Sequence, residues 1–125
     1  MKQFLRLLVI LFAVLFVVTG LRWATDPATA ASALGMSLMD GVGRSAQIGD
    51  VGALFLSMGM MILIGLITAK RSWFYAPALM LCLVALLRVL AWLLHDAALV
   101  MDMILLEIVV ASILVVAAPS LAQDD

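Results

Sequence analysis

Two charged residues stand inside long apolar runs of this 125-residue sequence. Arg88 lies in the stretch ALLRVLAW, and Glu107 lies in the stretch LLEIVVAS. A planar guanidinium and a carboxylate can form two parallel hydrogen bonds. The chemistry that these residue types allow is ion pairing, which fastens two helices together, or the binding of a headgroup, a small molecule or a proton.

The two charges are equally far from a short turn at about residues 95–98. In an antiparallel hairpin such residues lie at the same depth, roughly 10–14 Å from the turn end at 1.5 Å per residue. Asp50, near the start of an earlier apolar run, can reach Arg88 from a neighbouring helix. We therefore predict a buried polar cluster of Arg88, Glu107 and Asp50, which is either a structural ion pair or a binding site.

The other polar residues show no catalytic pattern. The sequence has no Ser-His-Asp spacing, phosphate-binding loop or zinc-type Cys/His cluster. Its single histidine, His95, lies at a turn, where it does not favour haem, and its single cysteine, Cys82, is typical of packing. Paired methionines can bind Cu(I), but they also fill apolar cores. We expect no enzyme activity, no metal and no cofactor.

The composition is that of a membrane protein. Hydrophobic residues make up 67% of the chain and charged residues 12%, whereas a soluble domain has about half and a quarter. A net charge of −1 provides no basic field for nucleic acid. We expect the lipid bilayer, and not nucleic acid, as the partner of this surface.

Four apolar runs are long enough to cross the hydrocarbon core, which takes about 20 residues of helix. They cover residues 4–21, 48–69, 73–94 and 98–118. The first run is long for the apolar region of a signal peptide, so we interpret it as a span. The sequence predicts an all-α, integral membrane four-helix bundle that forms one domain over residues 1–125.

The first loop contains a short helix in TDPATAASALG. Asp26 suits the N-cap, Pro27 the first helical position and Gly35 the end. We expect this helix to lie along the outer surface, at the membrane interface. The stretch DGVGRS at 40–45 is expected to turn the chain into the second span.

Basic residues predict the orientation, because cytoplasmic loops carry more lysine and arginine. With both termini cytoplasmic, the inner side holds Lys2, Arg6, Lys70 and Arg71, and the outer side holds Arg22 and Arg44. We expect both termini in the cytoplasm and the chain in a plasma membrane.

Small residues in the second span predict a helix-packing face, since close backbone approach drives helix association in lipid. The face consists of Gly49, Ala53, Ser57, Gly65 and Ala69. A ligand groove is the alternative interpretation of the same face.

Four stretches together resemble a known family. They are RWATDPATAASALGM, RSAQIGDVGALFLSMGMMIL, RVLAWLLHDA and LLEIVVASILV, and the sequence resembles small bacterial four-span membrane proteins known only as a domain of unknown function. The matching residues are Asp26, Pro27, Gly35, Gly52, Phe55, Leu56, Gly59, Arg88, Asp96 and Glu107. The sequence departs from the family at Ala46, Ile48 and Ala97. The resemblance implies a bacterial inner-membrane protein and this architecture, but no activity.

Two functions remain open at this point. The first is a non-enzymatic accessory or scaffolding subunit, which associates with itself or with a larger membrane complex. The alternative is a small-molecule, lipid or proton binding or transport protein, which uses the Arg88–Glu107 cluster.

Overall fold

The computed structural model describes residues 1–124, and its long elements are all helices. The long apolar helices are α1 (Lys2–Thr25), the continuous helix Gly41–Thr68, α5 (Ser72–Leu94) and α6 (Met101–Leu121). Each is long and apolar enough to cross a membrane. The chain is therefore a multi-pass membrane protein, and the prediction of an all-α fold with four long helices is confirmed.

The second long helix begins earlier than the sequence predicted. It consists of α3 (Gly41–Ala46), a π-helical turn η1 (Gln47–Val51) and α4 (Gly52–Thr68). The prediction that DGVGRS forms a turn is therefore wrong. The reason is local: Asp40 takes the N-cap position, and Arg44 binds the Asp40 carboxylate one helical turn later.

The short helix α2 (Pro27–Ala33) occurs in the first loop as predicted. Pro27 is its first residue, and Asp26 is at the N-cap, although the Asp26 side chain makes no capping hydrogen bond. Gly35 follows with φ of +75°, a conformation that favours glycine. The position of α2 at a membrane interface stays a prediction.

Residue contacts group the chain, for which we predicted one domain, into two compact units. One unit comprises residues 10–60, and the other comprises residues 1–9 together with residues from 61 onward.

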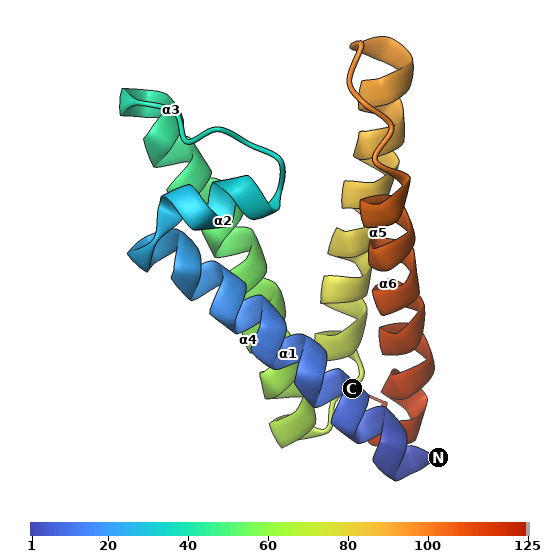
Figure 1. Ribbon diagram of the computed structural model, residues 1–125. Coiled ribbons are helices and arrows are strands. Elements are labelled where there is room, and N and C mark those ends of the chain that lie inside the picture. Colours follow the sequence, from blue (N-terminus) through green and yellow to red (C-terminus); the bar gives the residue numbers. More distant parts are fainter. Residues whose placement is uncertain (125) are drawn as a thin grey trace. The chain divides into compact units, whose positions relative to one another are not determined.

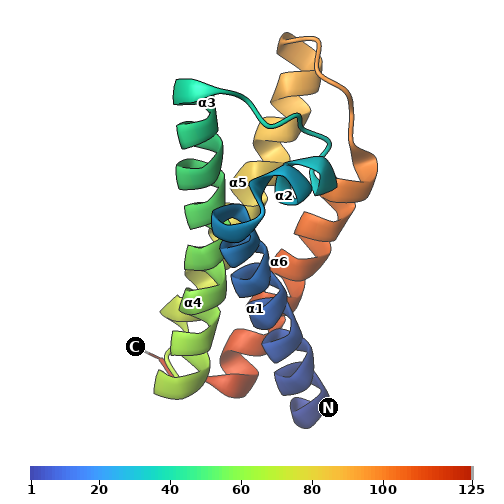
Figure 2. The ribbon, with the colours of Figure 1, turned by 60° about the vertical axis from the view of Figure 1, so that its left-hand side comes forward.

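In the unit of residues 10–60, α1 packs against α4 through glycines (Figures 1 and 2). A Cβ at Gly20 would lie 2.7 Å from Cβ of Leu56, and a Cβ at Gly59 would lie 2.6 Å from Cγ2 of Val17. Such close approach is how helices associate in lipid. A second cluster, around the fully buried Trp23, packs α2 and the loop after it against this helix pair.

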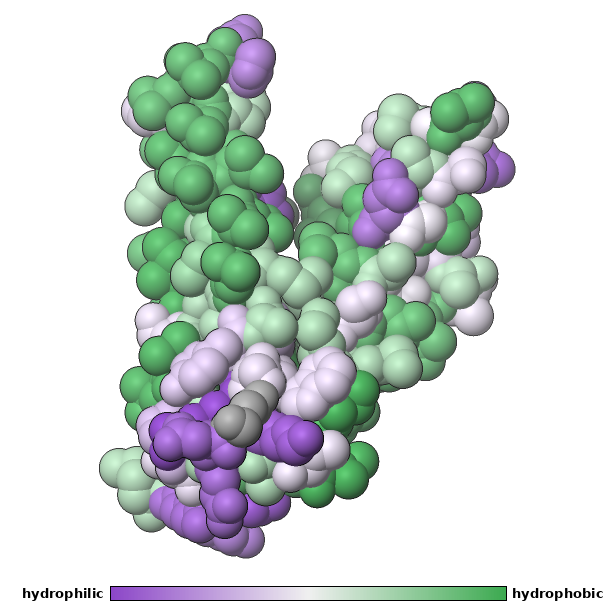
Figure 3. Space-filling model, turned by 180° about the vertical axis from the view of Figure 1, so that it is seen from behind, coloured by the Kyte–Doolittle hydropathy of each residue, from purple (hydrophilic) through white to green (hydrophobic). Residues whose placement is uncertain are grey.

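In the other unit, α5 and α6 form an antiparallel hairpin, side by side in Figures 1 and 2. Alanines contribute to the buried side of both helices, and their small side chains favour close approach of the two backbones. These are Ala78 and Ala85 of α5 and Ala111, Ala117 and Ala118 of α6. Figure 3 shows that the outward surface of this hairpin is hydrophobic along most of its length, and that hydrophilic surface gathers mainly at its ends.

Candidate functional site

Arg88 and Glu107 meet inside the α5–α6 hairpin. The Nε atom of Arg88 lies 3.0 Å from both carboxylate oxygens of Glu107. The two side chains are 28% and 13% exposed. The contact that the sequence predicted is present, but one N–H is shared between two oxygens, whereas we expected two parallel hydrogen bonds.

The shared hydrogen bond leaves the outer edge of the guanidinium free. Within residues 1–124, neither Nη atom of Arg88 makes a hydrogen bond. These two nitrogens carry N–H groups in a fork that fits a carboxylate or a phosphate. The pair therefore has donors on the Nη edge that a second oxyanion can use.

The two residues of the pair lie at equal depth in the hairpin. Arg88 is six residues before the end of α5 at Leu94, and Glu107 is six residues after the start of α6 at Met101. At 1.5 Å per residue, both lie about 9 Å from the turn end. Charges at such depth are costly in a bilayer unless they are paired, which explains why the two occur together.

Asp50, the third predicted member of the cluster, belongs to the unit of residues 10–60. It lies in the π-helical turn η1, and its side chain is exposed. Single π-helical turns inside α-helices often occur at functional sites. The contact between Asp50 and Arg88 stays a prediction.

The face of α4 that packs against α1 differs from the predicted one. Gly49, Ala53 and Ser57 are exposed, and a Cβ built at Gly49 would meet no atom within 4 Å. The contact with α1 uses Gly52 and Gly59 instead. The reason is that large apolar side chains accompany these two glycines, so this face offers close approach and buried area together.

The remaining two residues of the predicted face have different surroundings. Gly65 is buried, and a Cβ there would lie 3.0 Å from Cβ of Trp73. Ala69 follows the end of α4 with φ of +55°, and its carbonyl oxygen accepts a hydrogen bond from N–H of Gln123. Ala69 therefore ends the helix and does not extend a packing face.

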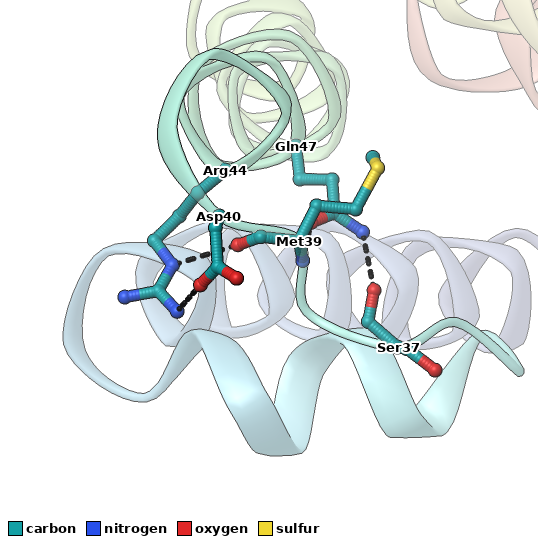
Figure 4. A network of polar contacts seen from close by, with 5 residues as sticks. All are labelled: Ser37, Met39, Asp40, Arg44 and Gln47. Carbon is teal, nitrogen blue, oxygen red and sulfur yellow. Dashed lines mark hydrogen bonds and ion pairs between the residues drawn. The ribbon is translucent and has the colours of Figure 1, made fainter.

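A buried glutamine, which sequence reasoning missed, holds the loop before α3 (Figure 4). Gln47 is 4% exposed, and its Oε1 accepts a hydrogen bond of 2.8 Å from N–H of Met39. Its Nε2 donates to the carbonyl oxygen of Ser37 at 3.0 Å, and Arg44 donates to that of Met39 at 2.8 Å. A lone amide side chain at the start of an apolar run is a signal that could have indicated this role.

We expect Gln47→Leu to loosen the loop of residues 36–40. The substitution removes the acceptor of the Met39 N–H, and a partly buried N–H without an acceptor costs about 1 kcal/mol or more. Amide hydrogen exchange, followed by mass spectrometry, should be about fivefold faster in this loop. Ser45→Ala, at an exposed residue of the same helix, is the control and should leave the exchange unchanged. An unchanged rate in Gln47→Leu would contradict the assigned role.

A second polar cluster ties the chain after α6 to the turn before α5. N–H of Arg71 donates to the carbonyl oxygen of Gln123, and the Arg71 guanidinium binds the carbonyl oxygen of Ala122 and the carboxylate of Asp124. The sequence pattern indicates a role for Arg71 only in membrane orientation, because contacts of a loop with a distant segment leave no local pattern. This cluster joins the open ends of the hairpin.

Two of the polar features thus hold loop or terminal segments in place, around Gln47 and Arg71, and the third, at Arg88, has donors without hydrogen bonds. The family resemblance stays a prediction and assigns no role to any of them. The chain matches no protein-family model, no curated protein and no solved structure.

Proposed function

We propose that this chain is a non-enzymatic accessory or scaffolding subunit, which associates with a second copy of itself or with a larger membrane complex. The observation that carries the proposal is the exposed face formed by Gly49, Ala53 and Ser57 on the second long helix. Small residues at this spacing allow close approach between helices in lipid, and α1 does not use them. A helix of another subunit is the partner that this face fits.

Asp50 adds a polar anchor to the same face. It lies three residues before Ala53 and seven before Ser57, so the three side chains leave the helix on one side. All three are exposed. A carboxylate at this position is stabilised when a partner helix donates a hydrogen bond to it. The face therefore favours a partner with polar donors.

We also propose that the protein resides in a bacterial inner membrane with both termini in the cytoplasm. Four candidate spans support an even number of crossings, and the basic residues support the orientation. The bacterial origin and the inner membrane rest on the family resemblance.

Cysteine cross-linking in native membranes tests the association. The wild-type chain has one cysteine, Cys82, which is exposed on α5, and the test variant S57C/C82S moves the thiol to the proposed face. We expect oxidation to cross-link S57C/C82S into a dimer, or to a subunit of a larger complex, in higher yield than the wild type. Adding A53L should lower that yield several-fold, because a large side chain prevents close approach.

Equal cross-linking yields from the two thiols would contradict the proposed face. Migration as a lone monomer in mild detergent, with no co-purifying protein, would contradict the function itself. A cross-linked product that contains only this chain would identify self-association, and a product with a second protein would identify a larger complex.

A second candidate function is the binding or transport of a small molecule, a lipid or a proton at the Arg88–Glu107 pair. The observation that favours it is the unused Nη edge of Arg88. A pair that serves only to hold two helices together gains nothing from donors left without acceptors.

A further inference from the structure

We propose that Arg88 and Trp92 of α5, together with His95 at the C-cap of α5, bind the phosphate group of an anionic membrane lipid. The headgroup would lie at the turn end of the α5–α6 hairpin. This inference rests on the second candidate function, which makes the Arg88–Glu107 pair a binding site, and it names the class of ligand.

Arg88 and Trp92 form a line of donors along α5, and His95 follows at the C-cap of the helix. Arg88 and Trp92 are four residues apart, so they leave the helix on the same side. The groups of the three residues are a guanidinium, an indole N–H and an imidazole. Trp92 is 44% exposed, His95 is exposed, and neither side chain makes a hydrogen bond within residues 1–124. The line runs from the ion pair to the turn.

The ion pair favours an oxyanion on this line. Glu107 occupies the Nε side of the guanidinium, and neither Nη atom makes a hydrogen bond within the described residues of its own unit. Asp102 does not fill this edge, because it precedes Glu107 by five residues and points about 140° away from it around α6. Asp96 lies at the turn, and no ion pair joins it to Arg88. A phosphate offers two oxygens at the spacing of the Nη fork.

The depth of the site favours a lipid over a free ion. Arg88 lies about 9 Å from the turn end, and its long side chain can extend toward the headgroups. The exposed side chains beside the line are apolar, among them Leu87, Leu93 and Leu94. They offer contact to acyl chains. We expect an anionic phospholipid to be preferred to a zwitterionic one, because its headgroup brings a net negative charge to the Nη donors of Arg88.

Fluorescence quenching by brominated lipids measures binding next to Trp92. The full chain carries W23F and W73F, so that Trp92 is the only tryptophan. W23F keeps an aromatic side chain in the core and removes no hydrogen bond, since the buried indole N–H of Trp23 has no acceptor within residues 1–124. In phosphatidylcholine vesicles, brominated phosphatidylglycerol should quench Trp92 with a preference of about two- to fivefold over brominated phosphatidylcholine.

Variants of the arginine decide whether the site causes that preference. R88Q should abolish it, and R71Q, which removes an arginine from the other end of α5, should keep it. R88K retains the charge but loses the fork, so it should lower the preference and serves where R88Q does not fold. The proposal would be overturned if R88Q and R88K both kept the full preference for phosphatidylglycerol. It would also be overturned if the two brominated lipids quenched Trp92 equally in the chain that retains Arg88.

Two further experiments distinguish a membrane lipid from free phosphate and from another ligand at the same site. Inorganic phosphate on both sides of the vesicles should leave the preference unchanged, and its loss there would overturn the lipid as the source of the phosphate. Absence of any lipid preference, combined with a cellular defect of a folded R88M/E107L variant, would overturn the lipid proposal. That result would leave the second candidate function standing.

Discussion

Replacing Glu107 with leucine should lower the free energy of unfolding by about 3–5 kcal/mol, the cost of leaving a buried charge without its partner. The carboxylate is 13% exposed, and Nε of Arg88 lies 3.0 Å from both of its oxygens. The substitution leaves the guanidinium of Arg88 in apolar surroundings, where an unpaired charge is costly. Unfolding by sodium dodecyl sulfate in mixed micelles, followed by circular dichroism, measures the loss.

Two further variants show whether the loss comes from the pair. Asp102→Asn changes an exposed carboxylate of the same helix that has no ion pair within residues 1–124, so its effect should stay within about 0.5 kcal/mol. The double variant R88M/E107L should recover most of the stability, because two apolar side chains carry no desolvation cost. An E107L chain as stable as D102N would show that the pair does not stabilise the hairpin.

The same double variant separates the two functions of the pair. A chain that folds and assembles normally, but fails in the cell, would assign the pair to binding. A chain that is normal in every respect would assign it to the stability of the hairpin alone. E107L measures the cost of leaving Arg88 unpaired, and R88M/E107L, once shown to fold and assemble, reports on function in the cell.

The ion pair could be predicted because its geometry follows from counting residues. A short turn joins α5 and α6, so positions at equal distance from it lie at equal depth, and a cation facing an anion there offsets part of the desolvation cost that each charge would carry alone. The hydrogen-bond pattern could not be predicted. It depends on the rotamer of Arg88, which brings Nε to Glu107, and the packing of the hairpin decides that rotamer.

The packing face of the second helix shows where sequence reasoning ends. Small residues occur on two sides of this helix, and spacing alone does not decide which side meets α1. The observed contact includes Phe16 and Phe55, whose ring centroids are 6.1 Å apart. Such large side chains add buried area beside the glycines, whereas Gly49 has no such neighbour. Local patterns likewise miss Gln47, because its partners lie in a loop that is eight to eleven residues away.

Gly59→Ala and Gly49→Ala should change stability in opposite directions, although both place the same methyl group on one helix. At Gly59 the new Cβ would lie 2.6 Å from Cγ2 of Val17 and 2.8 Å from the carbonyl oxygen of Ala13. The carbonyl is backbone and cannot rotate away, so α1 must shift. We expect a loss of about 3 kcal/mol, at the upper end of the usual cost of overpacking.

At Gly49 the new methyl group meets no atom within 4 Å. Alanine is a better helix former than glycine, so the detergent-solubilised monomer should gain up to about 0.5–1 kcal/mol. Unfolding by sodium dodecyl sulfate in mixed micelles, the measurement used for E107L, determines the stability of both variants. A loss at Gly49 similar to that at Gly59 would show that the Gly49 face is covered within the monomer. If Gly49→Ala stabilises the monomer and lowers the cross-linking yield of S57C/C82S in membranes, the Gly49 face serves association between subunits, while the Gly59 face holds α1 within one chain.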